Sequence, residues 1–228
     1  MKYREPLLDK LDRKIGRYAL KNLMTIIVIG TAIVWMLDMI VAERTGRLIS
    51  WYLEFDKTLI LKGQVWRVIT FIFVPDSYNL FFLAISLYFY WLIGNSLENE
   101  WGSLRFDIFY LCGVIGAVIS GFITGYTTNY YLNLSLFLAF AILYPNYRVL
   151  LFFFIPVKMK WLAIIDLVGI IALLIFEGWA GRIAIFFALG NIVLFFWKIP
   201  FNKIKQAHRR RKWKREARRD NNDYPFDL

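Results

Sequence analysis

The chain contains very few residues of the types that catalyse reactions or bind metals. Its 228 residues include one histidine, His208, and one cysteine, Cys112. A single cysteine cannot form a disulfide within the chain, and there is no CxxC pair for metal or redox chemistry. His208 lies in a strongly basic C-terminal stretch, beyond the last long apolar run. We therefore expect neither a cofactor nor a bound metal ion.

Four polar residues inside apolar runs are candidates for a polar cavity. They are Asn133, Ser135, Asp166 and Asn191. Polar groups in membrane spans usually bond to backbone or to a neighbouring helix, and a serine hydroxyl needs an adjacent base to act as a nucleophile. Ionisable groups within a membrane, in contrast, mark functional sites by default. Asp166 is therefore the strongest candidate, and proton-linked transport through it is one alternative function, although the lack of an obvious inverted repeat weighs against a transporter.

The elements that must position these residues are apolar runs long enough to cross a bilayer. The chain is 59% hydrophobic and 19% aromatic, with a mean hydropathy of +0.49, which is more apolar than soluble domains usually are. Runs of about 20 residues can cross roughly 30 Å of hydrocarbon. The sequence predicts an all-α membrane protein with six spans. They cover approximately residues 23–41, 79–95, 106–124, 130–144, 161–176 and 183–197.

Two connections are unusual. Residues 42–77 form a long link that mixes charged and aromatic segments without a run long enough to span, and loops of this length tend to be functional. We expect this first external loop to lie partly in the membrane interface, with Trp51, Tyr52 and Trp66 at headgroup level. The apolar stretch 149–157 is too short to cross the bilayer, so it is expected to be interfacial or re-entrant.

The distribution of charge divides the chain into three parts and predicts its orientation. Residues 1–21 form a basic amphipathic segment, residues 22–198 the membrane domain and residues 199–228 a basic tail. With both termini cytoplasmic, 22 Lys/Arg lie inside and 6 outside, as the positive-inside rule requires. Basic clusters next to a membrane commonly bind anionic lipid, so we favour lipid over nucleic acid as the partner of the tail.

A stripe of small residues marks the third span. It consists of Gly113, Ala117, Gly121 and Gly125. Residues four positions apart share a helix face, and in membranes small residues let helix backbones approach closely. We expect this helix to be central in the bundle and to pack against its neighbours through the stripe.

Three stretches, in this order, resemble the rhomboid superfamily. They are GQVWRVITFIFVP (63–75), LENEWGSLRFDIFYL (97–111) and LAFAILYPNYRVLLFFFIPVKMKWLA (138–163). The residues that carry the motifs are Trp66, Arg67, Glu98, Trp101, Gly102 and Arg105. The resemblance implies a six-helix rhomboid-like bundle with a water-filled cavity. It also implies the plasma (inner) membrane, and the last stretch is similar to bacterial members.

The resemblance further implies what the site should contain. Active rhomboids use a serine at the start of span 4, a histidine in span 6, and a histidine and an asparagine in span 2. The corresponding positions here are Tyr130, Ile185, Phe82 and Ser86, so the catalytic residues are missing. The resemblance therefore predicts an inactive pseudoprotease, not an enzyme, that binds transmembrane segments of client proteins. The alternative is an active intramembrane protease with Ser135 as a displaced nucleophile.

Overall fold

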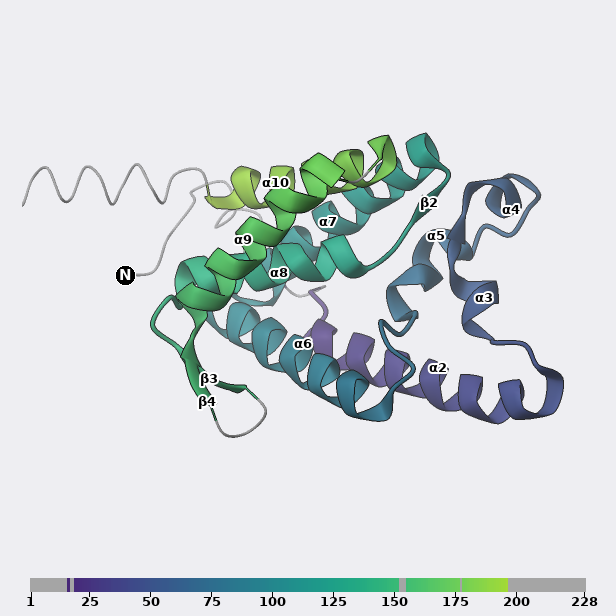
Figure 1. Ribbon diagram of the computed structural model, residues 1–228, viewed down its shortest axis with the longest axis horizontal. Helices are drawn as coiled ribbons and strands as arrows, with labels where there is room; N and C mark the ends of the chain where they lie inside the picture. The colour runs from purple at the N-terminus through teal and green to yellow at the C-terminus, as the bar shows by residue number, and fades with distance from the viewer. Residues whose placement is uncertain (1–15, 17–18, 152–154, 177, 197–228) are drawn as a thin grey trace, which may run out of the picture. The chain divides into compact units, whose positions relative to one another are not determined.

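The computed structural model describes residues 16, 19–151, 155–176 and 178–196 (Figure 1). The chain divides into two units, Met1–Asn191 and Ile192–Leu228. In the second unit only residues 192–196 are described, as the end of the last helix. Most of the predicted amphipathic segment 1–21 and all of the basic tail 199–228, with its expected lipid contact, lie outside the described residues.

Six apolar helices contain the predicted spans. They are α2 (Leu23–Thr45), α6 (Leu80–Trp101), α7 (Ser103–Thr124), α8 (Tyr130–Leu143), α9 (Met159–Phe176) and α10 (Trp179–Phe196). Among the described residues, five of these helices are long and apolar enough to cross a membrane. The exception is α8, whose 14 residues reach about 21 Å against a hydrocarbon core of roughly 30 Å. The all-α membrane class is confirmed, whereas a bundle of six full spans is not.

Of the six apolar helices, the short helix α8 has the largest share of buried residues. Nine of the 14 residues of α8 are buried, because α6, α7 and α9 all pack against it. Figure 1 shows α8 between α6 and α9. Helix α7 packs against α6, α8 and β2, and the expectation that it is the central helix stays a prediction.

The small residues of α7 have different structural roles. A Cβ atom added to Gly113 would lie 2.5 Å from Leu132 Cδ1, so this glycine lets α8 approach α7 closely. A Cβ atom on Gly121 would lie 2.5 Å from a ring carbon of Phe55, in the connection between α2 and α6. Gly125 instead ends α7 with a φ of +96°, a conformation that favours glycine. Gly113 therefore serves contacts with α8 and α10, Gly121 a loop contact and Gly125 a helix end.

The connection between α2 and α6 is folded. Its elements are α3 (Ser50–Leu53), β1 (Phe55–Asp56), α4 (Lys57–Leu61), α5 (Arg67–Thr70) and the 3₁₀ helix η2 (Phe71–Phe73). Strand β1 pairs antiparallel with β2 (Tyr126–Thr127), which precedes α8. The side chain of Asn129 adds two bonds from the same junction, donating to the backbone oxygens of Ile72 (3.2 Å) and Val74 (2.8 Å). The connection is thus anchored at the start of α8.

Arg67 holds the connection together from within. Arg67 is 3% exposed, and its guanidinium donates to the backbone oxygens of Trp51 (2.8 Å) and Glu54 (2.7 Å). The indole of Trp66 donates to the backbone oxygen of Tyr52 (3.1 Å). Trp51, Tyr52 and Trp66 each keep about half of their surface exposed, and their expected place in the membrane interface stays a prediction.

Residues 149–151 and 155–157 belong to two paired strands, and the expected place of this stretch in the membrane interface stays a prediction. Strands β3 (Arg148–Leu151) and β4 (Ile155–Lys158) pair antiparallel, with Arg148 opposite Lys158 and Val149 opposite Val157. A short apolar run fits a strand as well as a helix. Pairing within the hairpin satisfies backbone groups that an isolated apolar segment would leave without partners.

Two carboxylates from distant helices bind backbone N–H groups just before α2. Oε1 of Glu98 accepts from the backbone N–H of Asn22 (3.0 Å), and Oδ2 of Asp107 accepts from that of Leu20 (2.7 Å). The first N–H groups of a helix lack partners within the helix, and negative charge is favoured at this end of the helix dipole. Glu98 and Asp107 thus fix α2 to α6 and α7.

The contact between Gly121 and Phe55 predicts a matched pair of stability effects. Gly121→Ala should lower the free energy of unfolding by about 1–3 kcal/mol, because the new methyl group would overlap the buried ring of Phe55. Gly190→Ala should be close to neutral, because a Cβ atom there meets nothing within 4 Å. Thermal unfolding of the purified proteins in detergent measures both. Equal melting temperatures for Gly121→Ala and the wild type would contradict the close contact.

Candidate functional site

Cavities gather around the first residue of α8. Tyr130 lines four of them, with volumes of about 480, 330, 270 and 270 Å³. Tyr130 is the first residue of α8, and strand β2, which precedes it, lines two of the four cavities. This region is the candidate site.

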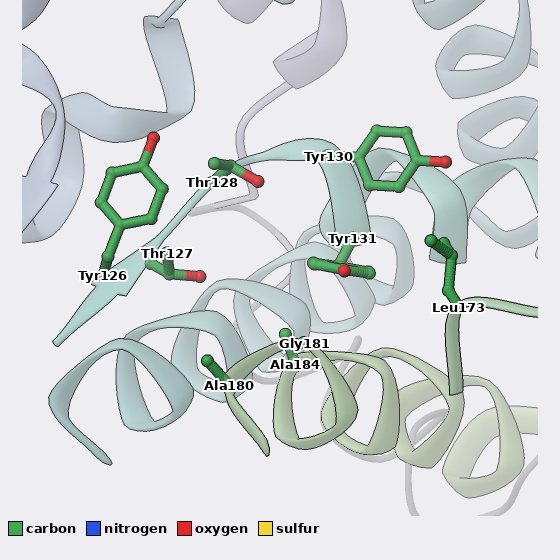
Figure 2. A pocket seen from close by; sticks show the side chains of 9 residues that line it. All are labelled: Tyr126, Thr127, Thr128, Tyr130, Tyr131, Leu173, Ala180, Gly181 and Ala184. Carbon is green, nitrogen blue, oxygen red and sulfur yellow. The ribbon is translucent and has the colours of Figure 1, made fainter. Parts of the chain in front are cut away.

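The largest of these four cavities, of about 480 Å³, lies between the β2–α8 junction, the last turn of α9 and the first turns of α10. Figure 2 shows its two kinds of wall. The junction contributes the hydroxyl-bearing side chains Tyr126, Thr127, Thr128, Tyr130 and Tyr131. Helices α9 and α10 contribute the small or apolar residues Leu173, Ala180, Gly181 and Ala184. The lining offers hydrogen bonds but no charged group.

Two further cavities, of about 270 and 330 Å³, share Tyr130 and Asp166. We call them together the lateral groove. The groove follows α8 between α6 and α9. Its α6 wall consists of Phe82, Ile85, Ser86, Phe89, Tyr90 and Ile93. Its α9 wall consists of Asp166, Gly169, Ile170, Ala172, Leu173 and Phe176. Most of the lining is apolar, so the carboxylate of Asp166 stands out.

Asp166 lies near the middle of its helix. Helix α9 has 18 residues, about 27 Å, and Asp166 follows its first residue by about 10 Å along the axis. Its Oδ2 atom is buried and has no hydrogen-bond partner. A carboxylate at the centre of a span costs roughly 2.5–3.5 kcal/mol on insertion scales. Among the described residues, no hydrogen bond to Oδ2 offsets this cost.

A second polar group borders the groove. Oδ2 of Asp76, in the link that precedes α6, accepts from the hydroxyl of Tyr90 at 2.5 Å. The side chain of Asn133 bonds to Asp76 as well. These bonds join the link to both α6 and α8. They also use the side chain of Asn133, which lines the groove.

The four residues predicted to form a polar cavity separate into two pairs. Asn133 and Asp166 line the lateral groove. Ser135 and Asn191 lie in the core on either side of Gly113, where an added Cβ would be 4.0 Å from Ser135 Oγ and 3.1 Å from Asn191 Nδ2. Ser135 donates to the backbone oxygen of Leu132 at 2.7 Å. Asn191 donates to that of Phe109 at 3.2 Å. The structure therefore does not bring all four together.

The positions compared with rhomboid catalytic residues are also scattered. Tyr130 lines the cavities, whereas Ile185 is fully buried in α10. Phe82 is 57% exposed on α6. Ser86 donates to the backbone oxygen of Leu83 at 2.9 Å, within its own helix. Catalysis by Ser135 and transport through Asp166 stay predictions.

Comparison with known families decides which family the chain represents. Residues 21–199 match the family described as Eukaryotic integral membrane protein (DUF1751). The chain belongs to this family. The match includes all six apolar helices and the folded connection between α2 and α6. No curated protein and no solved structure matches the chain.

The family corrects two expectations. The rhomboid resemblance is wrong, because the matching family is a different one and no rhomboid match was found. The plasma (inner) membrane of a bacterium is also wrong, because the family is eukaryotic. Membership of a eukaryotic family and five helices able to span support an integral multi-pass protein in contact with a lipid bilayer.

The motif residues have local structural roles that explain the misleading resemblance. Arg67 orders the connection and Glu98 caps α2, as described above. Gly102, with a φ of +87°, makes the turn between α6 and α7, and Trp101 stacks edge-on against Phe109 at 5.4 Å. Aromatic residues near interfaces and glycine at tight turns recur in unrelated membrane proteins.

The environment of Asp76 predicts a pH effect. Desolvation by neighbouring groups raises the pKa of Asp76. The hydrogen bonds from Tyr90 and Asn133 lower this pKa and only partly oppose the rise. Just above the ordinary pKa of about 3.9, the Asp76 carboxyl therefore binds more protons in the folded chain than in the unfolded chain. The contribution of Asp76 to the free energy of unfolding thus grows as the pH falls. Wild type should gain stability relative to Asp76→Asn between pH 7 and pH 4, measured by thermal unfolding.

Asp56 supplies a control of opposite sign. Hydrogen bonds from the side chain of Thr58 and the backbone of Leu59 lower the pKa of Asp56. Its contribution is present at neutral pH and is lost as the pH falls through the range of the lowered pKa. Wild type should therefore lose stability relative to Asp56→Asn on acidification. Parallel shifts for the two variants would contradict the assignment for Asp76.

Proposed function

We propose that this integral membrane protein binds transmembrane segments of other membrane proteins in its lateral groove, without catalysing a reaction on them. The observation that carries the proposal is the groove itself. It combines apolar walls with one buried, unpartnered carboxylate oxygen, on Asp166. A concave apolar surface with a few polar groups is the usual form of a binding site.

The walls of the groove suit a helix. On α9, Gly169 and Ala172 lie three and six residues after Asp166, on the same side of the helix. A Cβ atom on Gly169 would meet nothing within 4 Å, so this stretch of α9 is open. Small residues let a second helix approach closely, which is the main source of helix association in lipid. Phe82 and Phe176, at 57% and 85% exposure, stand on the two sides of the groove.

Crosslinking in intact cells tests this proposal. A photoreactive amino acid at Phe82 or Phe176 should give discrete adducts that mass spectrometry maps to transmembrane segments of other proteins. Ile29 on α2 is the matched control, because its exposure of 54% is close to that of Phe82 and it does not line the groove. Adducts of the same identity and yield at Ile29, or none at Phe82 and Phe176, would refute a specific groove.

The absence of catalysis is part of the proposal. It is supported by Ser135, which donates its proton to a backbone carbonyl oxygen, a group that cannot act as a general base. It is supported also by the position of the single histidine, His208, in the basic tail.

A fluorophosphonate probe tests this part directly. The folded protein should remain unlabelled, and Ser135→Ala should behave as the wild type does. An active serine hydrolase treated in parallel confirms that the probe is reactive. Labelling that disappears in Ser135→Ala, with unchanged thermal stability, would show a reactive serine and overturn the proposal that the protein is not an enzyme.

A further inference from the structure

We infer that the transmembrane segment held in the lateral groove carries a basic side chain that pairs with Asp166. This inference rests on the proposed function and adds the chemistry of the partner. It follows from three features of the groove: the depth of Asp166, the lack of a donor for its Oδ2 atom, and the open surface beside it.

The depth of Asp166 separates it from the headgroups. It lies about 10 Å from the start of α9 and about 15 Å from its end. A lipid headgroup does not reach the centre of a span, and an acyl chain has no hydrogen-bond donor. A side chain on another membrane helix can supply a donor at this depth.

Two polar side chains that line the groove are bonded elsewhere. Asn133 bonds to Asp76, and Ser86 donates to the backbone oxygen of Leu83. On α9 itself the nearest cation along the sequence, Lys160, lies over the ring of Trp161, with Nζ 5.3 Å from its centroid. The Oδ2 atom of Asp166 therefore stays without a partner although it is buried.

A basic side chain matches this oxygen best. An isolated carboxylate and an isolated ammonium are each costly in lipid, and bringing them together in a medium of low dielectric constant favours both. The open space at Gly169, one turn from Asp166, lets a partner backbone approach near enough for a lysine or arginine to reach the carboxylate. The groove thus selects segments with a cation near mid-membrane.

Synthetic single-span helices test the inference. The full chain, reconstituted in liposomes of neutral lipid, is mixed with labelled leucine–alanine helices that carry at their centre a lysine, a glutamate or no polar residue. Binding is measured by energy transfer to a fluorophore on the chain. The lysine helix should bind about tenfold more tightly than the apolar helix. Asp166→Asn should remove this preference, and Asp166→Lys should transfer it to the glutamate helix.

The transfer of preference in Asp166→Lys is the control for misfolding, because a misfolded protein would not gain a new specificity. A lysine helix whose cation is moved two turns toward one end is the positional control and should bind as weakly as the apolar helix. Equal binding of the three helices to wild type, or a lysine preference that persists in Asp166→Asn, would overturn the inference. The proposed function would then still stand on cellular crosslinks at Phe82, whereas loss of those crosslinks would remove the proposed function as well.

Discussion

The shortness of α8 is the constraint on which the rest of the structure depends. A helix of about 21 Å cannot fill the height of a bundle whose other members are long enough to cross the bilayer. The folded connection closes part of the remaining space, through the β1–β2 pair and the two bonds from Asn129. What is left open is the set of cavities around Tyr130. The short helix is thus the most buried of the six apolar helices, and its first residue lines all four of these cavities.

The helices could be predicted from the sequence, because long apolar runs have one favourable structure in a membrane. The hairpin formed by β3 and β4 could not, since a short apolar run does not distinguish strand from helix. The contact of Gly121 with the loop, and the bonds of Glu98 and Asp107 to the residues before α2, could not be predicted either. Both join residues far apart in the chain, and no local pattern records such pairs.

The candidate site was predictable in part. Asp166 could be singled out because a carboxylate in an apolar run is costly. Grouping Asn133 with Ser135 ignored the helical period: residues two positions apart point about 200° apart around a helix, and the two do face different surroundings. The rhomboid resemblance relied on residues such as Arg67 and Gly102, whose structural tasks many membrane proteins share. Motifs that order a loop or a turn carry little information about chemistry.

The capping of α2 has a consequence for biosynthesis. The acceptors on Glu98 and Asp107 come 76 and 87 residues after the N–H groups that they bind. At about 5–20 residues per second, the ribosome adds them roughly 4–17 s after the start of α2. The first helix must therefore reside in the bilayer with its leading amides hydrated or held by another protein, and it gains its final anchors only when α6 and α7 arrive.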